Sequence, residues 1–267
     1  MGTLYLSPYE DPEAHARISA LIRRHSSNDR DVRADLLRSL DLRGAHDILD
    51  LGCGFGFWSE ELAARVAPDA KFTGVDACAG NEASYARCVE SQGRRARFVR
   101  AHLVSVLPFD GDSFDLVIAA YSLYFFVGVI PEVARVLRPE GSFLAVTHSE
   151  RSFNGLLSAV GLADEACPLL RLRREFSSEG GESLLAGTFR RVERTNYLNT
   201  LTFEERDLGD LLGYLAFKLP LVRPGARYGA ELPDSFVRAA SVAMQQRGRL
   251  TVEKDDTLFV CREAHGR

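Results

Sequence analysis

The sequence predicts an α/β protein with a doubly wound, mostly parallel seven-stranded sheet, an antiparallel hairpin at the sheet edge and a helical lid. Short apolar strands alternate with helices between residues 46 and 150, which is typical of a parallel sheet covered on both faces. A glycine-rich turn follows the first of these strands, as in doubly wound folds that bind nucleotides. Beyond residue 150 the alternation ends, and longer helical segments lead to two alternating apolar runs near the C-terminus.

Residues 1–45 are expected to form an N-terminal helical cap. Apolar residues recur at spacings of three and four over residues 13–25 and 30–42, which favours two amphipathic helices. The chain has 267 residues, and one core of that size remains workable. We therefore expect the cap to belong to one domain with insertions.

Residues 46–150 form the predicted α/β core, in which strands and helices alternate. The expected strands are HDILDLG (46–52), KFTGVDA (71–77), ARFVRAH (96–102), FDLVIAAY (114–121) and SFLAVT (142–147). The expected helices are WSEELAARVAP (58–68) and the segments 81–92 and 129–138. In open sheets of this kind a ligand lies beyond the carboxyl ends of the strands, where the strand order reverses.

Residues 151–267 are expected to supply lid helices and C-terminal strands that complete the same sheet. The pattern predicts a helical region to about residue 172, a loop at 175–182, a strand at 189–203, and helices at 204–218 and 233–247. Asp255 and Asp256 separate two alternating runs in RLTVEKDDTLFVCRE (249–263), which indicates a tight hairpin.

Composition narrows the partners and the compartment. The formal net charge is -4, and no block of like charges is long enough to bind nucleic acid nonspecifically. The five cysteines are scattered and lack metal-ligand spacing, which favours a reduced cytoplasm and no metal. The N-terminus lacks the basic and apolar regions of a secretory signal, and the apolar stretch 116–130 is too short to cross a bilayer. We expect no nucleic-acid or membrane partner; the oligomeric state is not predicted.

The stretch DILDLGCGFGFW, residues 47–58, ends a strand in a loop with Gly52, Gly54 and Gly56. Glycines there allow a ligand to approach the backbone closely. The dinucleotide fingerprint requires a third glycine where Phe57 stands, and the GKS or GKT of a phosphate-binding loop is absent. Neither a dinucleotide nor a nucleoside phosphate fits this loop well.

Two carboxylates indicate the charge of the ligand. Asp50 stands two residues before Gly52. It would repel a pyrophosphate by about 1 kcal/mol in water, or about 4 kcal/mol near a protein surface at ~4 Å, and would attract a sulfonium or ammonium. Asp76 ends the second strand ~20 residues after the glycine loop, a place where an acid accepts ribose hydroxyls. The pattern predicts a ribonucleoside that carries positive charge.

With these residues the chain resembles the class I S-adenosylmethionine-dependent methyltransferases of the small-molecule type. The matching motifs are DLGCGFG (50–56), VDA (75–77), LPFDGDSFDLVIA (107–119) and VARVLRPEGSFLAV (133–146). They occur in order and cover about residues 46–150, so the resemblance is more specific than a lone glycine motif. It implies the cofactor S-adenosylmethionine.

The resemblance also implies cofactor contacts for particular residues. Asp50 and the backbone around Gly52 would hold the methionine part, and Asp76 would hold the ribose. His102 stands where many members have an acid that binds adenine, so either His102 or backbone groups hold that base. The full set of expected cofactor residues is Asp50, Gly52, Cys53, Gly54, Gly56, Asp76, Ala77, His102, Leu103, Ala120 and the cap residue Tyr9.

Three residues are candidates for catalysis. His148 follows a strand at its carboxyl end, and its pKa range suits a general base, although a loop or helix-capping histidine is the alternative. Tyr121 and Tyr124 follow the fourth strand, where the family places residues that face the transferable methyl group; packing is the alternative for both. Cys53 is expected to be a small filler.

The expected reaction is in-line transfer of a methyl group to an O, N or C nucleophile of a small organic substrate, with secondary or quinone metabolism as the expected setting. The family's NPPY or DPPY run, which accompanies amide or base nitrogen methylation, is absent where AYSLYF (120–125) stands. A carboxylate or thiolate acceptor would need no base. The alternatives are an RNA or protein methyltransferase, or a noncatalytic protein that binds the cofactor.

Overall fold

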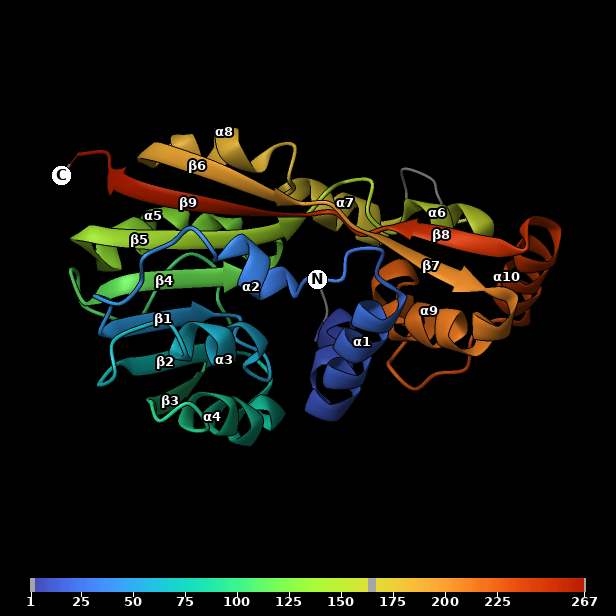
Figure 1. Cartoon of the computed structure of the whole chain (residues 1–267), viewed down its shortest axis with the longest axis horizontal. Helices are drawn as coiled ribbons and strands as arrows, with labels where there is room; N and C mark the ends of the chain where they lie inside the picture. Colours follow the sequence, from blue (N-terminus) through green and yellow to red (C-terminus); the bar gives the residue numbers. More distant parts are fainter. Residues whose placement is uncertain (1–2, 163–166, 267) are drawn as a thin grey trace.

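A mostly parallel sheet forms the left half of the molecule as drawn in Figure 1. The computed structural model describes residues 3–162 and 167–266. Within them the main sheet consists of β1 (Asp47–Leu51), β2 (Lys71–Asp76), β3 (Arg95–Arg100), β4 (Phe114–Ala120), β5 (Leu137–His148), β6 (Phe189–Tyr197) and β9 (Asp256–Ala264). The strand order is β3-β2-β1-β4-β5-β9-β6, with β1 to β5 parallel and β9 antiparallel to both neighbours. The predicted α/β class and the mostly parallel seven-stranded sheet with an antiparallel edge are confirmed.

Apolar side chains alternate between the two faces of this sheet, and helices cover both. Ile48 packs on one face with residues of α2 (Val32–Leu36), α3 (Phe57–Ala63) and α4 (Glu82–Glu90). Leu49 packs on the other face with residues of α5 (Ile130–Val136) and α8 (Gly181–Ala186). Because consecutive strand residues point to opposite faces, the run DILDL buries both sides of β1. The strand order reverses between β1 and β4, which places the carboxyl ends of both at one site.

The C-terminal strands correct the predicted hairpin. The run 249–253 forms β8 (Arg249–Glu253), which pairs with β7 (Thr200–Glu204) in a separate two-stranded sheet, whereas β9 pairs with β5 and β6. A two-residue hairpin of type I′ needs positive φ at both turn residues, and neither Asp255 nor Asp256 has it. The hairpin prediction was therefore wrong, and the antiparallel pair at the sheet edge is β9 and β6.

The predicted strand 189–203 is likewise broken in two. It bends at Leu198 and Asn199, so that β6 lies in the main sheet and β7 in the second sheet. Figure 1 shows β7 and β8 leading away from the main sheet toward α9 and α10. Paired backbone crosses the bend, because the Lys254 N–H donates to the Asn199 carbonyl at 3.0 Å. The two sheets are thus joined by one bent antiparallel ribbon.

The second sheet and the helices beside it form the lid. We define the lid as β7, β8, α6 (Asn154–Ala159), α9 (Leu208–Val222) and α10 (Asp234–Arg247). Its apolar core includes Leu201, Leu215 and Met244, and Leu21 of α1 (Pro12–His25) joins it. Asp11 caps α1, because its side chain accepts a hydrogen bond from the Ala14 N–H at 3.0 Å. Helix α1 of the N-terminal cap packs against β7 and α9 of the lid (Figure 1).

Several predicted helices differ in length. The helix expected at 30–42 is only α2, because the backbone tightens into turns after Leu37. The helical region expected to about 172 contains α6 and α7 (Pro168–Glu175), and residues 163–166 lie outside the described residues. The loop expected at 175–182 already contains the start of α8. In the described part of the chain no helix has the length and apolarity to span a membrane.

Asn199 fixes the bend of the ribbon to the cap. Its buried side chain donates to the Ser26 hydroxyl at 3.0 Å and accepts from the Asn28 N–H at 3.2 Å. We predict that Asn199→Ala lowers the free energy of unfolding by about 2 kcal/mol, because the Ser26 hydroxyl and the Asn28 N–H each lose a hydrogen-bond partner. Urea unfolding measures this, with exposed Gln245→Ala as the control. Equal stability of the two variants would contradict the assignment.

Candidate active site

The glycine loop between β1 and α3 has the backbone shape that its sequence predicts. Gly52, Gly54 and Gly56 have φ values of 71°, 52° and 97°. A Cβ on Gly52 would lie 2.5 Å from the Cβ of Ser122, so this position has no room for a side chain. Ser122 also donates to the Leu51 carbonyl at 2.6 Å. The loop is therefore held tightly against the segment that follows β4.

Asp50 is a buried carboxylate at the start of this loop. It is 2% exposed, and one oxygen accepts a hydrogen bond from the Ser59 hydroxyl at 2.6 Å. Burial, with a contribution from the charge of Asp76, raises the pKa of Asp50 to about 7. A neighbouring cation would restore the ionised form, so this group favours a positively charged ligand.

Asp76 ends β2 and organises the loops on both sides of it. Its carboxylate accepts from the Gly54 N–H at 2.9 Å and from the Cys78 N–H at 2.8 Å. The Asn81 amide approaches the same group at 3.4 Å. Asp76 lies 22 residues after Gly54 in sequence, and its side chain joins the two loops. Its place at the end of the second strand is the place where an acid binds ribose hydroxyls in doubly wound folds.

A cavity of about 500 Å³ extends from these loops to the lid. The predicted site residues that line it are Tyr9, Asp50, Gly52, Cys53, Gly54, Asp76, Ala77, His102, Leu103, Ala120, Tyr121, Tyr124 and His148. Gly56 does not line it. A Cβ on Gly56 would lie 2.9 Å from the Cβ of Cys88, so this glycine serves the packing of α3 against α4.

The adenine end of the cavity has no acidic side chain at the expected position. His102 is exposed and forms no hydrogen bond within the described residues, while Leu103 is half-buried beside it. The backbone there is ordered by the Ala101 N–H, which donates to the Asp76 carbonyl at 3.0 Å. Near His102 the cavity therefore offers backbone groups and apolar side chains as contacts for the adenine ring.

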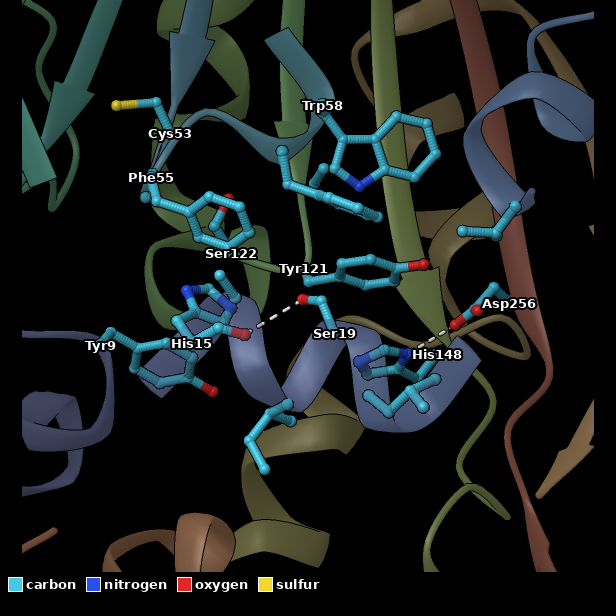
Figure 2. A pocket seen from close by; sticks show the side chains of 18 of the residues that line it. Tyr9, His15, Ser19, Cys53, Phe55, Trp58, Tyr121, Ser122, His148 and Asp256 are labelled. Atoms are coloured by element: carbon cyan, nitrogen blue, oxygen red, sulfur yellow. Dashed lines mark hydrogen bonds and ion pairs between the residues drawn. The ribbon is translucent and has the colours of Figure 1, made fainter. Parts of the chain in front are cut away.

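His148 faces the opposite end of the cavity and is held by an acid that the sequence did not reveal. Its Nδ1 lies 2.6 Å from a carboxylate oxygen of Asp256, which is 2% exposed. Lys254 donates to both oxygens of the same carboxylate, at 2.9 and 3.0 Å. The Lys254 ammonium also lies 3.2 Å from Nδ1. Because a carboxylate can only accept, the shorter contact with Asp256 assigns the proton to Nδ1 and leaves Nε2 with its lone pair. Figure 2 shows this pair beside Tyr121.

The charges around His148 fix its protonation state. Burial and the Lys254 ammonium lower the pKa of His148 to about 4, although Asp256 opposes this. Burial works against ionisation of Asp256, yet Lys254 and His148 hold the pKa of its carboxyl below the ordinary value. At neutral pH the site therefore contains a neutral imidazole, a carboxylate and an ammonium.

Tyr121 links the histidine to the glycine loop. Its ring stacks on His148 with centroids 4.3 Å apart and meets Trp58 edge-on at 6.1 Å (Figure 2). Its φ of 56° is unusual for a residue with a side chain, and such strain is common at functional sites. Burial and the carboxylate of Asp256 raise the pKa of Tyr121 well above its usual value. The phenol thus stays protonated.

The remaining aromatic candidates form an apolar wall. Tyr124 is buried and packs on Phe125 at 4.8 Å, and burial raises the pKa of its phenol as well. Tyr9 belongs to the short helix η1 (Thr3–Tyr9) and meets Phe217 of α9 edge-on at 5.6 Å. Burial also raises the pKa of the Cys53 thiol well above its usual value, so this residue offers no thiolate.

Several cavity residues were missed from the sequence. Asp256 was assigned to a turn, and Lys254 and Lys218 carried no motif. His15 of α1 lines the cavity, and burial, with Lys218, lowers its pKa to about 3. The helical periodicity of α1 placed it in the cap but gave no sign that this side chain reaches the cavity. In the described part of the chain no cluster of three or more possible metal ligands occurs.

Comparisons with known proteins agree with this geometry. Residues 48–141 match a family model described as a methyltransferase domain. Demethylmenaquinone methyltransferase of Lactococcus lactis subsp. lactis (strain IL1403) is 34% identical over 113 residues, 41% of this chain and 44% of the relative. Trans-aconitate 2-methyltransferase of Paracidovorax citrulli (strain AAC00-1) is 33% identical over 125 residues, 46% of each chain. The chain thus spans less than half the length of these curated relatives.

A solved structure covers more of the chain. The protein BH2331 of Bacillus halodurans C-125 superposes with a TM-score of 0.55 at 17% identity, over 87% of this chain and 98% of that one. At this identity the likeness shows the fold. It extends beyond the α/β core and includes much of the chain after residue 150, because the matched share is larger than the core alone.

Proposed function

Since the chain carries a class I S-adenosylmethionine-dependent methyltransferase domain, we propose that it methylates a small organic molecule in the cavity between the domain and the lid. One observation carries the proposal. A single cavity joins the two acids of the glycine loop, Asp50 and Asp76, to the neutral imidazole of His148. The cofactor end and the base therefore face the same space.

The residues at the loop end fit the cofactor. Gly52 lets the glycine loop pack directly against Ser122, which fixes the shape of this end of the cavity, and Asp50 is a buried acid whose ionisation a cation would restore. Asp76 stands at the strand end where ribose hydroxyls are bound. When bound, S-adenosylmethionine supplies an electrophilic methyl group on a sulfonium and leaves as S-adenosylhomocysteine.

The residues at the lid end fit an acceptor that loses a proton. His148 is neutral, and Asp256 fixes its Nδ1 so that Nε2 accepts the acceptor's proton as the new bond to carbon forms. Tyr121 and Tyr124 are protonated, so they orient the acceptor by packing and hydrogen bonding. The lid excludes water and aligns the reactants, which accounts for ~7–11 kcal/mol in well-oriented reactions.

The size and lining of the cavity support a small acceptor. A volume of about 500 Å³ lies within the range of small-molecule sites, and aromatic side chains such as Phe217 and Tyr214 form much of its wall. The acceptor class we propose is an acidic O, N or C nucleophile, of the kind found in quinone or secondary metabolism. The formal net charge of -4 gives no support to an RNA substrate.

Asp50 makes a prediction about cofactor binding. We expect the affinity for S-adenosylmethionine to fall as the pH drops from 8 to 6, because a carboxyl with a pKa of about 7 loses its charge over that range. Asp50→Asn should weaken binding of the sulfonium by about tenfold, or ~1.4 kcal/mol, and remove this pH dependence. Calorimetry at pH 8 and at pH 6 measures both effects.

The control for this experiment is Asp69→Asn, which changes an exposed acid outside the cavity and should leave both affinity and pH dependence intact. S-adenosylhomocysteine, which lacks the sulfonium charge, should bind with a weaker pH dependence than S-adenosylmethionine. If Asp50→Asn binds the sulfonium as tightly as the unmodified protein at pH 8, the assignment of Asp50 is wrong.

His148 makes a prediction about turnover. We expect His148→Gln to slow methyl transfer ~10²- to 10⁴-fold while cofactor affinity is unchanged, because the variant lacks a general base. In the unmodified protein kcat/KM should fall as the pH drops toward about 4, where His148 gains a proton. The assay is release of S-adenosylhomocysteine with a panel of hydroquinones, catechols and enolisable acids.

Two further variants sharpen this test. Asp256→Asn should lower kcat and alter the acid limb of the profile, because Nδ1 loses its ionic partner. His46→Gln changes an exposed histidine outside the cavity and should behave as the unmodified protein. Turnover by His148→Gln at the normal rate would show that the acceptor needs no base and would exclude this role for His148.

A further inference from the structure

The lysines of this chain are concentrated in the cavity. Among 33 lysine and arginine residues, lysine occurs only at positions 71, 218 and 254. Lys218 of α9 and Lys254, between β8 and β9, both line the cavity, whereas Lys71 is exposed at the start of β2. Two of the three lysines thus face the space assigned to the acceptor. A positive charge in such a place is unfavourable unless an anion compensates it.

Lys254 has its partner inside the protein. It is 7% exposed and donates to both oxygens of Asp256, so its charge is compensated. Its ammonium also lies 5.1 Å from the ring centroid of Tyr121. This lysine belongs to the structure that holds His148, and it leaves no charge over for a ligand.

Lys218 has no such partner. Within residues 3–162 and 167–266 no carboxylate lies within ion-pair distance of its ammonium, which is 5.4 Å from the ring centroid of Phe217. Burial, with repulsion from Lys254 and Arg173, lowers the pKa of Lys218 to about 7. A cation that must enter a cavity without an anion is unfavourable, so a ligand that supplies one would be bound preferentially.

Arg173 adds to the same excess of positive charge. It lies on α7, is 3% exposed and donates from Nη2 to the Asn154 side chain at 3.2 Å. Its Nε and Nη1 have no hydrogen-bond partner within the described residues. The guanidinium lies near Tyr124 and Tyr214, which line the cavity, whereas Arg173 itself does not line it. The Glu150 carboxylate acts on its charge from a distance, and within residues 3–162 and 167–266 no carboxylate forms an ion pair with it.

The acids and the unpaired lysine of the cavity belong to different segments of the chain. Asp50 and Asp76 stand at the glycine loop, whereas Lys218 lines the cavity from α9; within the described residues Asp256 is paired with Lys254, and no acid forms an ion pair with Lys218. We propose that the methyl acceptor carries a carboxylate group that forms an ion pair with Lys218. A monoanion suits this place better than a phosphate, because Lys218 offers a single ammonium, and the arginines that line the cavity among the described residues, Arg23, Arg30 and Arg33, are each paired with an acid. This inference rests on the proposed methyltransferase function.

Binding of a carboxylate at Lys218 would also act on His148. Lys218 is one of the cations that lower the pKa of that histidine, after burial and Lys254. The titratable and charged groups that face Lys218 are Lys254, Arg173, His148 and His15, from four different segments of the chain. An anion among them raises the proton affinity of Nε2, so acceptor binding itself makes His148 a better base.

The test measures binding of matched acids and amides in the presence of S-adenosylhomocysteine. The probes are 4-hydroxybenzoate and trans-cinnamate, each paired with its primary amide, and the method is calorimetry at pH 6.5. We expect each acid to bind at least tenfold more tightly than its amide. In Lys218→Met this difference should vanish, while the exposed control Lys71→Met should retain it.

A second variant and a pH series complete the test. Acid affinity should fall as the pH rises above about 7, because Lys218 then loses its proton. Lys218→Arg keeps its charge at every pH, so it should bind the acids without this decline. Unchanged affinity of the Met and Arg variants for S-adenosylhomocysteine shows that they are folded.

The outcomes separate this inference from the proposed function. Amides that bind as tightly as the acids, acids that do not bind at all, or Lys218→Met that prefers acids as before would each overturn the carboxylate site. Failure of the unmodified protein to bind S-adenosylhomocysteine would instead contradict the proposed function. A preference for acids that depends on Lys218, in a protein that binds S-adenosylhomocysteine, supports the carboxylate site.

Discussion

The hydrogen bond between His148 and Asp256 joins the two parts of the chain that the site requires. His148 ends β5 in the α/β core, and Asp256 begins β9 after the chain has passed through the lid, 108 residues later. A carboxylate buried at 2% exposure would be unfavourable alone, and Lys254 offsets its charge with two hydrogen bonds. The same contact holds the imidazole against the ring of Tyr121. The start of β9, the imidazole of His148 and the segment after β4 are therefore positioned together.

The distribution of charge gives the cavity a direction. Two carboxylates stand at the glycine loop, where a sulfonium nucleoside is proposed to bind, and lysines stand at the lid end. The neutral state of His148 depends on burial and on Lys254, with a smaller contribution from Lys218. A ligand that compensates the lid charge raises the basicity of that histidine. Under the proposed function, recognition of the acceptor and its activation would use the same electrostatic arrangement.

The α/β core could be predicted from the sequence because its signals are local. Ile48 and Leu49 point to opposite faces of the sheet, as the apolar run of β1 indicates. Gly52 has a positive φ, which glycine adopts readily, and so have Gly54 and Gly56 in the same loop. Asp256 could not be predicted in the same way, because its burial depends on His148 and Lys254, which tertiary structure brings to it. The bend at Asn199 is also tertiary, since its side chain binds the cap at Ser26 and Asn28. Lys218 gave no local signal, because only the fold places it beside the cavity.

The central claim is that this cavity binds a cationic sulfonium nucleoside at the glycine loop. Isothermal titration of the unmodified protein with S-adenosylmethionine tests it most directly, because binding precedes every later step and requires no knowledge of the acceptor. The account predicts saturable binding of one molecule per chain, together with a higher melting temperature in the presence of the ligand. The absence of both heat and thermal stabilisation at millimolar ligand would contradict it.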